Sequence, residues 1–233
     1  MLNHGIKPHL VGFGATLALL AMLQGCATLS EADCLSADWA VMGEADGEQG
    51  RSISELNRYR RQCADYGVVP DSEAYLDGRE RGLARYCTET NGYQEGRAGA
   101  AYQPVCPASL DPGFQRAHQL GHAVFTTLTE LRQSNDSIDF ARNTIDDLES
   151  EIADAEASIR SGDLDDEEKE RLRDKVDSNN RRIKSLEDEV DVLTGSVAIS
   201  IVEYQAAVEA ARREGYDEPM EGELLQQLWR LIR

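Results

Sequence analysis

Residues 138–160 read IDFARNTIDDLESEIADAEASIR, and an isoleucine returns at every seventh position of this stretch. A further apolar residue follows three positions after each of the first three isoleucines. Apolar residues that alternate three and four positions apart are the heptad pattern of a coiled-coil helix. The predicted seam contains Ile138, Ala141, Ile145, Leu148, Ile152, Ala155 and Ile159.

The pattern breaks at Ser161-Gly162-Asp163 and then resumes. An acidic run at 163–168 suits the start of a second helix, and Arg212 and Arg213 before Gly215 suit its end. The second seam contains Leu172, Val176, Ile183, Leu186, Val190, Leu193, Val197 and Tyr204, with the polar Asn179 as a residue that fixes register.

The break favours an antiparallel hairpin within one chain over a parallel coil between chains. We expect the hairpin at residues 111–214, with its turn near 161–165 and its first helix starting at Asp111-Pro112. Hairpins can also pair into four-helix assemblies, so a homo-oligomer stays open. Gly195 marks a point in the second arm where another backbone can approach closely.

The tail at 215–233 contains a short amphipathic segment, 223–232. We expect this helix to fold back on the hairpin base or on the preceding domain, with capture of a partner as the alternative. Its apolar face contains Leu224, Leu228, Leu231 and Ile232, with Trp229 beside it.

Residues 34–110 differ from the hairpin because they are rich in glycine, aromatic residues and cysteine. Glycines four apart strip one helix face, so that another backbone or a large ring can come close. Each glycine also lowers helix stability by about 1 kcal/mol relative to alanine, so these helices need packing and disulfides. Residues 75–79 and 93–97 share a tyrosine, a glycine and an arginine, which indicates a faint internal repeat.

The N-terminal residues have the features of a targeting segment. Residues 10–22 carry no charge, but they are too few for the roughly 20 apolar residues of a spanning helix. Leu23-Gln24-Gly25-Cys26 looks like a lipobox. We therefore expect a lipoprotein signal peptide at 1–25 and a lipidated linker at 26–33; the alternative is an ordinary secretory signal.

Lipid on Cys26, a diacylglyceryl group plus an acyl chain such as palmitate, predicts a stable attachment to the cell envelope. By resemblance to enterobacterial lipoproteins, Ala27 rather than Asp after the cysteine suggests the outer membrane, facing the periplasm, while the inner membrane and the cell surface stay open. The net charge of −19 argues against nucleic acid as a partner. It also predicts repulsion from anionic lipid, which would leave the covalent lipid as the sole membrane attachment.

Once Cys26 is assigned to lipid, an even number of cysteines remains. In an oxidising compartment they predict two disulfides, for which three connectivities exist. Sequential pairing closes the shortest loops and is preferred here. A zinc site is the rival, but no two of these cysteines are spaced as C-x2-C. The four residues are Cys34, Cys63, Cys87 and Cys106.

The residues of this half resemble a family of Gram-negative lipoproteins known as domain of unknown function 2799. The resemblance covers roughly residues 30–125 and implies an exported, lipidated envelope protein, often continued by a coiled coil; it supplies no activity, ligand or catalytic residue. It rests on Cys34, Trp39, Gly43, Asp46-Gly47, Gly50, Cys63, Tyr75, Gly78-Arg79, Gly82-Leu83, Tyr86-Cys87, Gly92, Gly96, Gly99, Tyr102 and Cys106.

Few residues are candidates for chemistry. His118 and His122, four apart on a helix, could share a metal, but no third ligand is evident and Gln119 stands where a zinc protease has its glutamate. Asp46 and Asp77 would be the choices if the domain held a glycosidase cleft. The candidate binding face for a glycan or peptide contains Trp39, Tyr75, Arg79, Tyr93 and Arg97.

Together these patterns predict an all-α protein, in which a small disulfide-braced helical domain precedes a long hairpin. The leading hypothesis is a non-catalytic envelope lipoprotein that acts as a structural or protein-interaction module, without a cofactor. A module that binds peptidoglycan or another glycan is the alternative, and a metal-binding protein comes third. The expected partners are the membrane, through the lipid, and envelope proteins or peptidoglycan.

Overall fold

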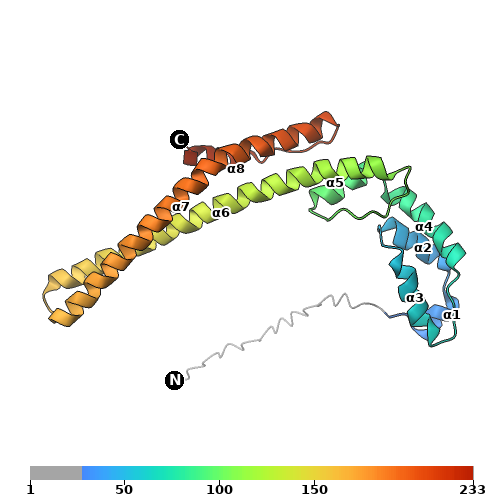
Figure 1. Ribbon diagram of the computed structural model, residues 1–233, viewed down its shortest axis with the longest axis horizontal. Helices are drawn as coiled ribbons and strands as arrows, with labels where there is room; N and C mark the ends of the chain where they lie inside the picture. Colours follow the sequence, from blue (N-terminus) through green and yellow to red (C-terminus); the bar gives the residue numbers. More distant parts are fainter. Residues whose placement is uncertain (1–27, 233) are drawn as a thin grey trace, which may run out of the picture.

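The computed structural model describes residues 28–232, and every regular element of this part of the chain is a helix, as predicted. The molecule is elongated, with the hairpin turn at one end and the helices of residues 31–86 at the other (Figure 1). The predicted signal peptide and Cys26 lie outside the described residues. The helices are α1 (Glu31–Ser36), α2 (Trp39–Glu48), α3 (Ser54–Ala64), α4 (Ser72–Tyr86), α5 (Glu89–Arg97), α6 (Asp111–Ser161), α7 (Asp166–Arg213) and α8 (Gly222–Ile232).

Helices α6 and α7 form the predicted hairpin, and α7 returns along α6 (Figure 1). Gly162 takes a left-handed conformation with φ 82°, which ends α6. Asp165 then caps α7, because its carboxylate accepts from the Glu168 backbone N–H while the Glu168 side chain accepts from the Asp165 N–H. Across the arms, Asn179 donates to Glu151 at 3.2 Å. The hairpin prediction is therefore confirmed.

Helix α8 folds back onto the base of the hairpin, as expected for the tail. Leu225 and Leu228 are buried in the same core as Tyr204 and Val208 of α7. The tail is also held by polar contacts, since the Tyr204 hydroxyl accepts from the Glu221 backbone N–H at 3.1 Å. The C-terminal segment is thus part of the hairpin core.

Helices α2 and α4 are packed backbone to backbone through glycine. A Cβ on Gly43 would lie 2.0 Å from the carbonyl oxygen of Tyr75, and one on Gly47 would lie 2.4 Å from that of Arg79. A Cβ on Gly78 would lie 1.9 Å from the carbonyl oxygen of Ala40. The contacts advance in the same direction along both helices, so the helices run parallel.

Helices α5 and α6 repeat this arrangement. A Cβ on Gly92 would lie 2.5 Å from the carbonyl oxygen of Phe114, and one on Gly96 would lie 2.0 Å from that of His118. Gly121 of α6 completes the contact, because its Cβ would lie 2.2 Å from the carbonyl oxygen of Tyr93. The two parallel helix pairs are therefore two copies of one structural unit.

The turn after the first helix of each pair repeats as well. Gly50 has φ 61° and packs under the ring of Tyr86. In the second pair, Gly99 has φ 78° and packs under the ring of Phe125. A side chain from the second helix fastens the residue that follows the turn: Arg79 donates to the Arg51 carbonyl at 2.8 Å, and His118 Nε2 lies 2.8 Å from the Ala100 carbonyl.

This repeat differs from the one expected from the sequence. Residues 75–79 belong to the second helix of the first pair, whereas residues 93–97 belong to the first helix of the second pair. Their likeness therefore relates positions that are not equivalent in the fold. The predicted domain boundary at 110 coincides with the start of α6, but the first turns of α6 belong to the second helix pair. The two domains thus share one continuous helix.

Candidate functional site

The four cysteines pair sequentially, as preferred from loop length. Cys34 is bonded to Cys63, and Cys87 is bonded to Cys106. Each bond joins the segment at or before the first helix of a pair to the connection that leads to the second helix. The two disulfides therefore occupy equivalent places in the two repeats, and each one braces its own glycine-packed pair.

The first helix pair encloses a buried carboxylate, Asp46, which is 2% exposed. It accepts hydrogen bonds from the hydroxyls of Tyr75 at 2.7 Å and Tyr59 at 3.1 Å, and from Arg51 Nη1 at 3.1 Å. Burial, followed by the hydrogen bond to Asp46, raises the pKa of Tyr75 above its ordinary value. Asp46 thus connects α2 to α3 and α4. Asp77, the second residue considered for a glycosidase cleft, is exposed on α4.

The predicted binding face does not exist as one surface. Trp39, Tyr75 and Arg79 are buried within the first helix pair, and Tyr59 of α3 lies against the first two rings. Aromatic and arginine residues at helical spacing suggested a groove, but the same spacing serves a core. The glycan-binding alternative therefore loses the surface on which it depended.

The other two residues of that face, Tyr93 and Arg97, lie in the second helix pair and bind Glu218 of the tail. The Tyr93 hydroxyl donates to Glu218 at 2.6 Å and Arg97 Nε donates at 2.9 Å, while Tyr216 stacks on Tyr93 with ring centroids 3.9 Å apart. Burial, followed by the bond to Glu218, raises the pKa of Tyr93. Sequence reasoning missed Glu218, because one glutamate in a strongly acidic chain carries no signal.

The two histidines lie on one face of α6, with ring centroids 5.8 Å apart. His118 is buried, and its Nε2 is 2.8 Å from the Ala100 carbonyl, which can only accept, so this nitrogen carries the proton. His122 Nδ1 lies 3.3 Å from the Thr126 hydroxyl. The buried His118 thus holds the turn after α5 in place. Among residues 28–232, no three His, Cys, Asp or Glu side chains are grouped so that they could hold a metal ion.

Tyr102 packs edge-on to His118, with ring centroids 5.8 Å apart. Its hydroxyl donates to Asp111 at 2.5 Å, and this hydrogen bond raises the pKa of Tyr102 to about 12. The contact joins the loop before α6 to the first turn of that helix. It adds to the same packing that holds His118.

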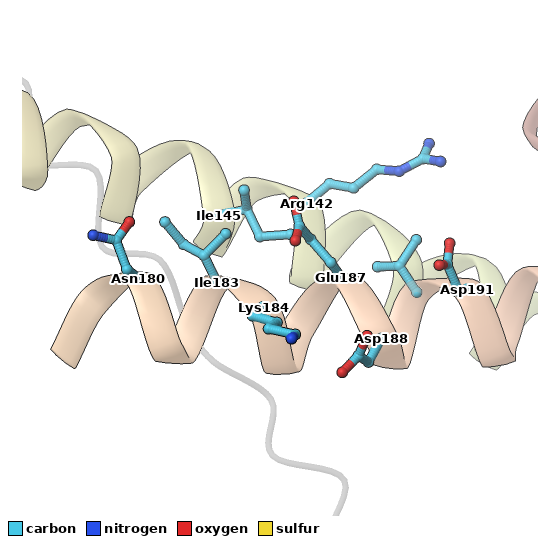
Figure 2. A pocket seen from close by; sticks show the side chains of 9 residues that line it. Arg142, Ile145, Asn180, Ile183, Lys184, Glu187, Asp188 and Asp191 are labelled. Carbon is cyan, nitrogen blue, oxygen red and sulfur yellow. The ribbon is translucent and has the colours of Figure 1, made fainter. Parts of the chain in front are cut away.

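The hairpin carries a shallow hollow of about 650 Å³ between its arms. Figure 2 shows Ile145 of α6 and Ile183 of α7 pointing toward each other, while Asp188 points away from α6. The two isoleucines are seam residues, so the floor of the hollow is the coiled-coil core. Charged side chains form its rim, which is the surface expected of a solvated hairpin.

Comparison with known proteins finds a match to a protein family. Residues 38–123 match the model of a family described as "Protein of unknown function (DUF2799)". The matched segment begins at Asp38, which caps α2, and ends just after Gly121 in α6, so it spans both helix pairs. No curated protein and no solved structure matches the chain. Within residues 28–232, no helix combines the length and the apolar character needed to span a bilayer.

Proposed function

We propose that this chain, whose residues 38–123 match the model of the DUF2799 family, is a non-catalytic lipoprotein of the cell envelope. In this proposal the paired helices form a braced base close to the membrane. The hairpin is an arm that reaches from the base toward partners in the envelope, either other proteins or peptidoglycan.

The observation that carries the proposal is the continuity of α6. Its first turns are locked into the second helix pair through Gly121, and the same helix continues to Ser161 as the first arm of the hairpin. A helix rises about 1.5 Å per residue, so α6 extends roughly 50 Å beyond Phe125. The arm therefore has no hinge at its base, which suits a spacer or a docking arm.

The tail strengthens the same junction. Glu218 is held by Tyr93 and Arg97 of the second pair, and Arg212 Nε near the end of α7 donates to the Glu218 carbonyl at 2.9 Å. The base is thus bound to both arms of the hairpin. Because both arms are fixed, the orientation of the base determines where the tip of the hairpin lies.

Two features support an envelope location. The sequence around Cys26 has the pattern of a lipobox, and the remaining cysteines are paired, which suits an oxidising compartment. The acidic surface suits a solvated arm. Neither feature calls for a reaction, and the proposal assigns none.

The first test is chemical. Mass spectrometry of the N-terminal peptide from membrane-extracted protein should show acyl chains on Cys26, and the Cys26→Ser variant should leave the membrane fraction. An unmodified Cys26 in membrane-extracted wild type would refute the lipoprotein proposal.

The second test concerns the arm. p-Benzoylphenylalanine in place of Ser161, at the turn, should capture envelope components in cells, whereas the same residue in place of Leu76 on α4 should not. A variant that lacks residues 145–151 and 177–183 removes one heptad from each arm at the same level, so the seam is kept while the arm shortens by roughly 10 Å. Adducts at Ser161 should then be lost; adducts confined to Leu76 would contradict the arm.

A further inference from the structure

The start of the described chain is fixed against α3. The backbone N–H of Leu29 donates to the Gln62 side chain at 3.4 Å, and Leu29 packs against the core that contains Cys34 and Cys63. Thr28 and Leu29 line a hollow with Arg61 and Tyr66 of the neighbouring α3 segment. The path of the chain is therefore set within three residues of Cys26.

This short distance constrains where the base can lie. An extended chain spans at most about 3.5 Å per residue, so Thr28 lies within roughly 7 Å of Cys26. If Cys26 carries the lipid, its backbone sits at the headgroup layer of the bilayer. The surface of α1 and α3 around Thr28 must then face that layer.

Three large apolar side chains are exposed on this part of the molecule. Leu35, Tyr66 and Val69 are 67%, 42% and 83% exposed. They belong to segments that meet at one disulfide, since Leu35 follows Cys34, and Tyr66 and Val69 follow Cys63. Apolar side chains with a tyrosine among them suit the boundary between headgroups and acyl chains.

Arginines accompany them. Arg58 is neutralised by Glu55, whereas Arg60, among the residues that the structure describes, binds the neutral side chains of Asn57 and Ser72. Arg61 is exposed and forms no ion pair with any residue that the structure describes. Guanidinium groups without a carboxylate partner are suited to bind phosphate oxygens bidentately.

We propose that Leu35, Arg60, Arg61, Tyr66 and Val69, together the anchor-proximal surface, lie on the phospholipid headgroup layer. The arginines bind lipid phosphates, and the three apolar side chains contact the boundary of the acyl chains. This inference rests on the proposed lipid at Cys26. It replaces the expectation that an acidic chain touches the membrane through its lipid alone.

The contact orients the protein. Glu31, Asp33 and Asp65 lie nearby, and the whole chain has a net charge of −19, so the surface would not hold the protein on a membrane by itself. The tether instead keeps a weak contact at high local concentration. Since α1 and α3 lie at the opposite end of the long axis from the hairpin turn (Figure 1), this orientation points the arm away from the bilayer.

Photo-crosslinking to lipid tests the proposal with a control of matched exposure. The full lipoprotein is reconstituted in vesicles of phosphatidylethanolamine with a minority of phosphatidylglycerol. p-Benzoylphenylalanine replaces Val69, which is 83% exposed, or Val192 of α7, which is 74% exposed. Irradiation should give a phospholipid adduct, seen as a mass increase, on the order of tenfold more often at Val69 than at Val192.

A second variant tests the arginines. The double change Arg60→Glu and Arg61→Glu should lower the Val69 adduct several-fold while circular dichroism and the two disulfides stay unchanged. Equal adduct yields at Val69 and Val192 on a protein whose N-terminal peptide carries acyl chains would overturn the proposal and leave the lipoprotein standing. An N-terminal peptide without acyl chains would remove both. Yields unaffected by the arginine changes would overturn phosphate binding.

Discussion

The two helix pairs and the hairpin share α6, yet they are held together in opposite ways. In the pairs, glycine removes side chains from the contact, so that one backbone lies on another, as Gly78 does on Ala40. In the hairpin, Ile138 and Val197 are fully buried seam residues whose side chains interdigitate between the arms. The contact within each pair requires that the glycines have no side chain, whereas the contact between the hairpin arms is made by apolar side chains.

This difference explains why the disulfides of the described residues brace the pairs. Glycine adds nothing to helix stability, and short helices such as α2 and α5 are marginal without outside support. The hairpin has long helices and a continuous apolar seam, so it needs no cross-link. The comparison also predicts where the molecule tolerates change: substitutions that add atoms should be severe in the pairs and mild in the hairpin.

The largest effect is expected for Gly78→Ala. The new Cβ would lie 1.9 Å from the Ala40 carbonyl oxygen, and because that atom is backbone, the helices must separate. We expect a loss of about 3 kcal/mol in the free energy of unfolding, at the upper end of the usual range for overpacking. Urea denaturation followed by circular dichroism measures it.

The matched control for that variant is Ala141→Val in the hairpin seam, which also adds atoms at a buried position. A loss at Ala141 as large as that at Gly78 would break the comparison, because it would make the hairpin as intolerant as the pairs. The two changes should also differ in place, with the Gly78 variant altering the base and leaving the hairpin helical.

The next effect is expected from removing the second disulfide. The double change Cys87→Ser and Cys106→Ser frees the connection before α6 and should lower the free energy of unfolding by between about 2 and 3 kcal/mol. Amide hydrogen exchange should show faster exchange in α5 than in the distal arm of α6. Uniform acceleration along the whole of α6 would show that the pair and the hairpin unfold as one unit.

A smaller effect is expected for Asp46→Asn. The carboxylate accepts from two tyrosine hydroxyls and an arginine, while the amide replaces one acceptor oxygen by a donor. We expect a loss of about 2 kcal/mol, typical for hydrogen bonds to a charged group. Thermal unfolding measures this loss, and Asp77→Asn is the control because it removes the same charge from an exposed side chain. Equal losses of stability in the two variants would contradict the role of Asp46 as a buried acceptor.

The sequence predicted the hairpin in detail because the heptad pattern is local. The spacing of the seam residues predicts both the helix that contains them and the face that packs on the other arm. The glycines predicted close approach of helices but not the partner. The repeat escaped notice because the connection between the two helices is longer in the first pair, which destroys any single offset.

The failed binding face has a different cause. Tyr75 and Arg79 occur at a helical spacing that is the same whether the face is buried or exposed, so only the tertiary structure distinguishes the two. Glu218 was missed because its partners, Tyr93 and Arg97, lie far away in the sequence. Long-range polar contacts of single residues leave no local pattern.

Gly195 gives the smallest effect and the one with opposite sign. It lies inside α7, but a Cβ there would meet nothing within 4 Å, unlike the interior glycines of the helix pairs. Gly195→Ala should therefore stabilise the isolated chain by up to about 1 kcal/mol through helix propensity alone. In thermal unfolding, the melting temperature of Gly195→Ala should lie above that of the wild type and the melting temperature of Gly78→Ala below it. A destabilised Gly195→Ala variant would mean that another backbone lies against α7 in solution, and analytical ultracentrifugation would then test for a second copy of the chain.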